Sequence, residues 1–353
     1  MQTYIIAEIG INFNGSLENC YKMIDMSVKA GCNAAKFQVF SAKNLYPKSA
    51  GKLNWKDDKE EYSYDIYEAV EKFELPNEWV DKLILYCKDK NIDFMASVFD
   101  IDGLNIMVQK GMKVIKLSSY TITNIPLIEA SAKTGLPIIM STGGATIGET
   151  EEAVNTVLKY HDNLTILHCS IAYPTELKDV NMGVMDTFSK AFPNIKTGYS
   201  DHTAEISDAP VQSIYLGGTV VEKHITLDKR MKGPDHFFAL EPNELKRMVD
   251  DIRQAEIDYK NNNFIIDETI YGNTAKICHK HEKYLRDFCY MTLFSRRDIK
   301  KGEIIRKEDI SILRAGKKEK GIEPKYLKLF EENIVRASCD INFEDPIKWS
   351  SIL

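Results

Sequence analysis

One arrangement recurs along this chain: a helix-like stretch ends in glycine and is followed by a short apolar stretch. The glycines are Gly31 before 34–40, Gly111 before 114–119, Gly135 before 137–142, and the pair Gly217-Gly218 before 219–226. Glycine just past the end of a helix adopts the left-handed conformation that releases the chain into the next element. Four such repeats predict alternating strands and helices, and hence a parallel sheet.

The same pattern extends to eight candidate strands. They span 3–10, 34–40, 93–99, 114–119, 137–142, 164–170, 196–202 and 219–226. Eight parallel strands with helices between them favour an α/β fold of the (β/α)₈ TIM-barrel type. A doubly wound open sheet is the alternative, but its glycine-rich dinucleotide fingerprint does not occur in the sequence. The long connection after the second strand, with an acidic, tyrosine-rich stretch at 57–74, is expected to be a partly helical insertion.

The pattern ends after Lys260. We therefore predict a barrel domain over 1–262, a polar linker over 263–287, and a compact, mainly β domain over 288–353. A domain this small buries little apolar surface of its own, so we expect it to dock on a neighbour.

Charge and cysteine usage limit the function classes. The chain has 46 Lys+Arg against 52 Asp+Glu, a net charge of −6, which does not favour nucleic acid or an anionic membrane as a partner. No apolar run approaches the ~18 residues of a membrane span, and the first residues do not resemble a signal peptide. The seven cysteines show no CxxC spacing, which argues against a disulfide framework and a zinc ribbon. We expect a cytoplasmic protein.

Polar residues gather at the carboxyl ends of the predicted strands, where active sites of this barrel type lie. They are Glu8, Lys36, Lys116, Ser118, Ser119, Ser141, Thr142, His168, Ser200, His202, Glu222 and His224. A buried ion pair or a structural histidine could explain any one of them. Because strands of a parallel barrel are buried on both faces, so many polar residues at one end indicate a site.

His202 and His224 end consecutive strands, so their rings can converge and leave other coordination positions open. Such a pair suits a catalytic divalent metal. His279 and His281 lie in the predicted linker, and we expect them on the surface.

Two lysines and three serines suggest an anion pocket: Lys36, Lys116, Ser119, Ser141 and Ser200. The alternative is that both lysines pair with Glu8 and Glu222 in a closed network. Asp235 follows the last strand, where it could contact a substrate hydroxyl or simply form a turn.

Several segments in order carry a family resemblance: IAEIGINFNG, AAKFQ, STGGAT, HCSIAYPTEL, GYSDHT, EKHITLD and GPDHFF. Together they resemble the sialic acid synthase family, the phosphoenolpyruvate-condensing nonulosonate synthases. The region from Phe288, with RRDIKKGE, resembles that family's antifreeze-like (SAF) domain.

The resemblance implies condensation of phosphoenolpyruvate with an N-acylated mannosamine-type aldose, giving a nine-carbon sugar acid and phosphate. It assigns a divalent metal, Mn²⁺ or Mg²⁺, to His202 and His224, and phosphoenolpyruvate to the lysines and serines above. Glu8 and Glu222 become the candidates for orienting water and moving its proton, and Asp235 binds the sugar. It also implies a homodimer whose SAF domain caps the partner barrel and contributes Arg314 to the partner's sugar pocket.

Three positions depart from the family pattern: Phe13 stands where histidine is usual, Thr121 where an acid is usual, and Ile171 where asparagine is frequent. A threonine offers one neutral partner to a sugar hydroxyl where a carboxylate offers two charged ones. Thr121 and Ile171 therefore favour a diacetamido-trideoxyhexose over N-acetylmannosamine. A related barrel making a phosphorylated 3-deoxy sugar acid and a non-catalytic sugar-binding homologue are the alternatives.

Overall fold

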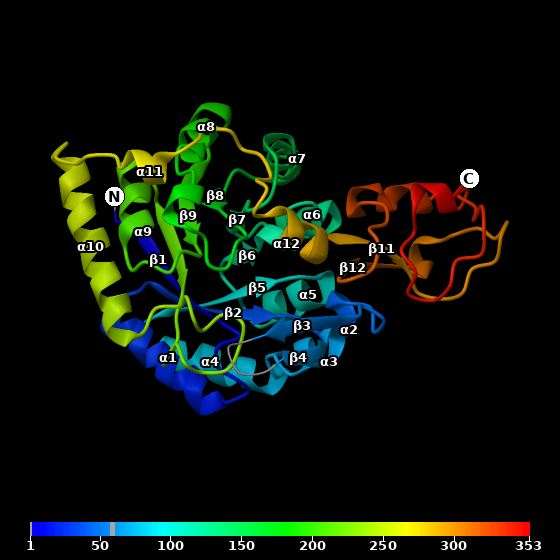
Figure 1. Cartoon of the computed structure of the whole chain (residues 1–353), viewed down its shortest axis with the longest axis horizontal. Helices are drawn as coiled ribbons and strands as arrows, with labels where there is room; N and C mark the ends of the chain where they lie inside the picture. The colour runs from blue at the N-terminus through cyan, green and yellow to red at the C-terminus, as the bar shows by residue number, and fades with distance from the viewer. Residues whose placement is uncertain (1, 57–60) are drawn as a thin grey trace.

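Eight parallel strands close a barrel in the computed structural model, which describes residues 2–56 and 61–353 (Figure 1). Their order around the barrel is β1-β10-β9-β8-β7-β6-β5-β2. The bounds are β1 Tyr4–Gly10, β2 Ala34–Val39, β5 Asp93–Val98, β6 Ile115–Leu117, β7 Ile138–Ser141, β8 Leu164–Cys169, β9 Lys196–Asp201 and β10 Val220–His224. The predicted (β/α)₈ barrel is confirmed.

A helix follows each barrel strand. These helices are α1 Leu17–Ala30, α4 Asn77–Asp89, α5 Ile101–Gln109, α6 Ile125–Lys133, α7 Ile147–Leu158, α8 Val184–Ala191, α9 Asp208–Tyr215 and α10 Pro242–Lys260. The sequence signals start and stop them: the Ser16 side chain accepts from the Asn19 amide at the start of α1, and Gly31 ends it at φ 92°. Thr146 and Glu149 form a capping box at α7.

The insertion after β2 contains α2 Ala42–Leu45, an antiparallel hairpin of β3 Lys52–Lys56 and β4 Glu61–Asp65, and α3 Ile66–Glu71. The helices agree with the expected helical parts, and the hairpin was not predicted. Residues 57–60 of the predicted stretch 57–74 lie outside the described residues.

The barrel interior is layered. An apolar layer at the amino ends of the strands contains Ile6, Ala34, Met95, Ile139, Leu167 and Val220. Because side chains alternate along a strand, the residue two positions later faces the same interior. Those later residues are Glu8, Lys36, Ser97, Ser141, Cys169 and Glu222. The strands therefore place a polar layer above an apolar floor.

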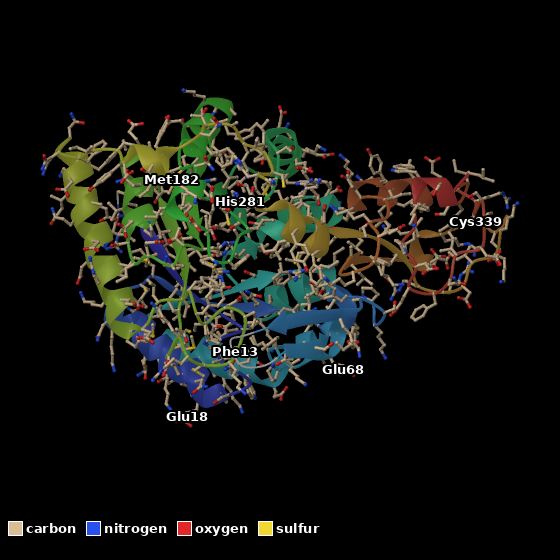
Figure 2. All side chains as sticks on the ribbon, in the orientation of Figure 1. Phe13, Glu18, Glu68, Met182, His281 and Cys339 are labelled. Carbon is tan, nitrogen blue, oxygen red and sulfur yellow. The ribbon has the colours of Figure 1, made fainter. Side chains whose placement is uncertain are left out.

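The C-terminal residues form a lobe beside the barrel (Figure 1). It contains the antiparallel pair β11 Met291–Ser295 and β12 Ile310–Arg314, and a small apolar core around Leu293, Ile305 and Phe330. Figure 2 shows Cys339 toward the outer end of this lobe.

The segment predicted as a linker is folded against the barrel. It includes α11 Glu268–Tyr271 and leads into α12 Lys283–Cys289, which crosses the predicted boundary at 288. The amides of Ile147 and Met182 donate to the carbonyls of Lys276 and Ile270, both at 2.9 Å. Within the described residues, no helix is long and apolar enough to span a bilayer.

Candidate active site

Lys36 is the centre of the polar layer. Its Nζ lies 2.8 Å from Glu8 Oε2, 3.4 Å from Glu222 Oε2 and 2.8 Å from Ser97 Oγ. All three charged side chains are nearly inaccessible to solvent. The closed lysine–glutamate network that the sequence left as an alternative is therefore present.

The second lysine extends this network across the barrel. Lys116 Nζ lies 3.5 Å from Glu222 Oε1 and donates to Ser141 Oγ at 2.8 Å. Ser200 Oγ donates to Glu222 Oε1 at 3.1 Å. Two lysines, two glutamates and two of the predicted serines thus belong to one buried cluster.

Ser119 lies in the 3₁₀ turn Ser119–Thr121 after β6, and its Oγ accepts from the Gly143 amide at 2.9 Å. This bond joins the loop after β6 to the loop that begins at Ser141. The place of Ser119 in an anion pocket stays a prediction.

The two carboxyl groups differ in acidity. Burial raises the pKa of Glu8, although Lys36 opposes it. Burial acts on Glu222 in the same way, but Lys116 and Lys36 outweigh it and lower its pKa. Burial lowers the pKa of Lys116, whereas the two carboxylates raise that of Lys36. Environments that shift the pKa values of two neighbouring carboxyl groups in opposite directions suit an acid and a base in one site.

His202 and His224 converge beside this cluster, with ring centroids 5.4 Å apart. His202 Nδ1 lies 2.7 Å from the Ser170 carbonyl, which assigns a proton to Nδ1 and leaves Nε2 for a ligand. His224 Nδ1 is buried and has no hydrogen-bond partner within residues 2–56 and 61–353. Both rings therefore fit a divalent cation.

Protonation would compete with a cation at these rings. Burial lowers the pKa of His202, but neighbouring Cys169 and the Ser170 carbonyl raise it to about 9. Burial and His202 lower the pKa of His224. In the described part of the chain no group of three or more His, Cys, Asp and Glu side chains could hold a metal ion. The candidate metal site therefore consists of two histidine ligands.

Asp235 lies on the loop between β10 and α10, and its Oδ2 is 3.8 Å from His224 Nδ1. Burial raises the pKa of this carboxyl to about 6. Asp235 thus lies beside His224, and its contact with a sugar stays a prediction.

His168 does not belong to the site, because it faces the outer side of β8. Its Nε2 lies 2.7 Å from the Val180 carbonyl, and its ring contacts Phe188 of α8. The two linker histidines are half-buried rather than on the surface, and His281 Nε2 lies 3.2 Å from Ser170 Oγ. Figure 2 shows His281 over the barrel and away from the C-terminal lobe.

Arg314 is half-buried and packs against its own barrel. Its guanidinium lies 5.6, 5.3 and 4.9 Å from the ring centroids of Tyr46, Phe99 and Tyr120. The C-terminal domain is predicted not to cover the site of its own barrel; in the single chain Arg314 packs against three rings of that barrel. Its place in a partner's pocket stays a prediction.

The three departures from the family pattern are buried. Thr121 is fully buried, and its hydroxyl donates to the Ser118 carbonyl at 2.9 Å. Phe13 packs against Phe37 and the edge of Trp79. Ile171 lies against the Gly143-Gly144 loop. Their effect on sugar choice stays a prediction.

Sequence reasoning missed Gln38, Ser97 and Tyr173. Gln38 Nε2 donates to Glu8 Oε1 at 2.8 Å, and Ser97 accepts from Lys36. Gln38 lies two residues after Lys36, so the period of a strand could have found it. The Tyr173 ring lies 4.2 Å from that of His202, a loop contact that no periodicity indicates.

Comparisons with known proteins identify a family and agree with the fold. Residues 23–263 match the NeuB family model. The chain is 35% identical to the spore coat polysaccharide biosynthesis protein SpsE of Bacillus subtilis over 99% of its length and 93% of the relative. The crystal structure of that protein covers 100% of this chain and 95% of its own, with a TM-score of 0.88. The N,N'-diacetyllegionaminic acid synthase of Campylobacter jejuni is 36% identical over 89% of this chain and 90% of its own. The chain belongs to the NeuB family.

Proposed function

We propose that this protein is a synthase that condenses phosphoenolpyruvate with an N-acylated mannosamine-type aldose. The observation that carries the proposal is the buried cluster of Lys36, Lys116, Glu8 and Glu222. It lies inside the barrel, next to the apolar layer at the amino ends of the strands. Two lysines with Ser119, Ser141 and Ser200 supply positive charge and hydroxyl donors for a phosphate and a carboxylate.

The reaction forms one carbon–carbon bond, forms one carbon–oxygen bond with water, and breaks the carbon–oxygen bond to the phosphate. The enol double bond of phosphoenolpyruvate attacks the sugar aldehyde, whose oxygen takes a proton. Water then adds to the electron-deficient carbon 2, and phosphate leaves with its bridging oxygen. The products are a 2-keto sugar acid and inorganic phosphate.

Glu222 and Glu8 divide the proton transfers. Glu222, whose pKa is lowered, is ionised and accepts the proton of the attacking water. The raised pKa of Glu8 favours this carboxyl group as the one that delivers a proton to the aldehyde oxygen. Lys36 contacts both carboxyl groups.

His202 and His224 would hold a divalent cation, Mn²⁺ or Mg²⁺, which when bound supplies Lewis-acid polarisation of the aldehyde. Asp235, beside His224, orients a sugar hydroxyl. His202 is itself fixed by its bond to the Ser170 carbonyl.

The sugar is proposed to be a 2,4-diacetamido-2,4,6-trideoxyhexose, with N-acetylmannosamine as the alternative. Relatives named N,N'-diacetyllegionaminic acid synthase support this choice at 36% and 33% identity. The human relative named N-acetylneuraminate-9-phosphate synthase, at 33% identity over 72% of this chain, favours the alternative.

The test is phosphate release from phosphoenolpyruvate with a panel of N-acetylmannosamine and diacetamido-trideoxyhexoses. We expect release with at least one of them, and the highest kcat/KM with a diacetamido sugar. Activity with a phosphorylated pentose or tetrose instead would favour the related barrel. Tight sugar binding without phosphate release would favour the non-catalytic homologue.

We also propose a homodimer in which the C-terminal SAF-like lobes are exchanged. Exchange of an identical element keeps the same contacts but makes them between subunits. Arg314 would then meet Tyr46, Phe99 and Tyr120 of the partner barrel.

Mixing Arg314→Ala with Lys36→Ala chains tests the exchange. We expect part of the activity to return, because one mixed site contains neither substitution. No recovery, or a monomer at micromolar concentration, would contradict it.

The proposed compartment is the cytoplasm. Seven free cysteines fit its reducing conditions.

A further inference from the structure

Helix α12, which precedes the C-terminal lobe, is hydrogen-bonded to the loop after β7. Glu282 lies at the start of α12, Arg286 within it and Tyr290 at its end. Residues four apart on a helix lie above one another, so these three share one face. That face is turned to Gly143 and Gly144.

These hydrogen bonds involve the backbone of both glycines. The Gly144 amide donates to Glu282 Oε1 at 2.9 Å, and Arg286 Nη1 donates to the Gly144 carbonyl. The Tyr290 hydroxyl donates to the Gly143 carbonyl at 2.8 Å. With Gly143 donating to Ser119 Oγ, every polar backbone atom of the two glycines is bonded.

Glu282 is a buried carboxylate on three backbone amides. It is 2% exposed, and besides Gly144 it accepts from Ile171 at 3.2 Å and from His279 at 2.9 Å. Hydrogen bonds to an ionised acceptor are about twice as strong as neutral ones. One linker side chain therefore ties together the loops after β7 and β8.

The same loop is closed on its other side. A Cβ at Gly143 would lie 2.7 Å from Ile171 Cγ2 and 2.9 Å from Ser119 Oγ, so only glycine fits there. The loop follows Ser141, the last residue of β7, whose hydroxyl accepts from Lys116. Its backbone thus has α12 on one side and the proposed phosphoenolpyruvate cage on the other.

We propose that α12 is a clamp that aligns Ser119 and Ser141 for phosphoenolpyruvate, with Glu282, Arg286 and Tyr290 as positioning residues. The inference rests on the proposed function. It also gives the C-terminal lobe a route to the site, because α12 leads directly into β11.

The decisive variant is Glu282→Gln, which keeps the size of the side chain and removes its charge. Weakening three charge-assisted bonds should raise the KM for phosphoenolpyruvate about tenfold. The KM for the sugar should not change, and kcat should stay within about threefold. Direct titration of phosphoenolpyruvate should show the same loss, which a purely structural role would not produce.

Glu344→Gln is the matched control. The Glu344 carboxylate also joins the lobe to the barrel through backbone amides, those of Lys48 and Ser49 at 2.9 and 3.0 Å, but on a different loop. It should leave both KM values unchanged. Tyr290→Phe removes one hydroxyl from the clamp and should raise the KM for phosphoenolpyruvate about threefold.

The outcomes separate the two proposals. A wild-type protein that does not bind phosphoenolpyruvate overturns the proposed function and the clamp with it. Wild-type binding that Glu282→Gln or Tyr290→Phe leaves unchanged overturns the clamp alone. If Glu282→Gln does not fold, Tyr290→Phe decides.

Discussion

The polar residues on the outer and inner faces of β9 and β10 differ in how fully they are hydrogen-bonded. On the outer face, Lys223 Nζ donates to Asp201 and to the carbonyl and hydroxyl of Thr203, at 3.0 and 3.2 Å. Asp201 Oδ1 also accepts from the Tyr199 hydroxyl and the Thr203 amide. All three ammonium protons of Lys223 are therefore used.

The inner face of the same strands is incompletely bonded. His224 Nδ1 has no hydrogen-bond partner among the residues that the structure describes, and Asp235 is still 3.8 Å away. Lys36 and Lys116 both lie near the Glu222 carboxylate, at 3.4 and 3.5 Å, and Lys36 also pairs with Glu8 at 2.8 Å. Buried polar groups are normally satisfied. On β9 and β10, the unpartnered His224 nitrogen therefore distinguishes the inner face, which carries the candidate site, from the outer face.

The largest effect should come from the inner face. His224→Ala should lower kcat/KM about 10³-fold, because carbonyl polarisation by a metal supplies several kcal/mol. The melting temperature should change little, since an unpartnered nitrogen is lost. Kinetics, thermal unfolding and Mn²⁺ titration measure the three quantities.

Chelation of the wild-type protein is the control for this variant. It should produce the same loss, and chelation should cost the variant nothing more. Full activity of both in chelator would contradict the metal assignment.

The outer face should show the opposite behaviour. Lys223→Met leaves Asp201 as an uncompensated buried charge, which should lower the free energy of unfolding by about 3–5 kcal/mol. Activity of the folded protein should fall much less than in His224→Ala. Urea unfolding and kinetics at low temperature provide the measurements.

Lys229→Met is the comparison for Lys223→Met. Its ammonium pairs with Glu244 at 2.7 Å, but the Lys229 side chain is 29% exposed, so the loss should stay below about 1 kcal/mol. Equal losses in the two variants would show that burial does not distinguish the pairs.

His168 gives the outer face a pH dependence. Burial lowers its pKa to about 3, from 6.5, so the folded chain keeps it neutral where the unfolded chain binds a proton. Stability should therefore fall as the pH drops below 6.5, by about 2–3 kcal/mol at pH 4.5 from this group.

His168→Gln keeps an N–H donor for the Val180 carbonyl but does not titrate. Its unfolding free energy should depend less on pH between 6.5 and 4.5 than that of the wild type, as chemical unfolding at several pH values would measure. Parallel curves would assign the acid sensitivity to other groups.

The barrel and most of the inner face could be predicted from the sequence. Glycines after helices and the lengths of the apolar stretches predicted the eight strands. The carboxyl ends of these strands then indicated the lysines, the glutamates and the histidine pair. Strands buried on both faces show no alternation, so the sequence could not tell that Cys169 faces inward and His168 outward.

The docking of the linker could have been found in part. Glu282, Arg286 and Tyr290 repeat every four residues, which indicates one helical face with a common partner. Which loop they bind depends on tertiary packing, and the sequence contains no signal for it. The polarity of this segment made it resemble a free connection, although its polar groups bond to barrel backbone.

The smallest effect should come from Thr121, which tests whether a polar residue beside the cluster behaves like the inner or the outer face. Its hydroxyl already donates to the Ser118 carbonyl, and the side chain is fully buried. Thr121→Val should therefore cost about 1 kcal/mol of stability. The ratio of kcat/KM for 2,4-diacetamido-2,4,6-trideoxymannose and N-acetylmannosamine should change less than about twofold, because the hydroxyl is already bonded to the Ser118 carbonyl. Thr121→Ser, which keeps the hydroxyl, is the control and should retain the hydrogen bond. A tenfold change of the ratio in Thr121→Val alone would instead support the predicted role of this residue in substrate choice.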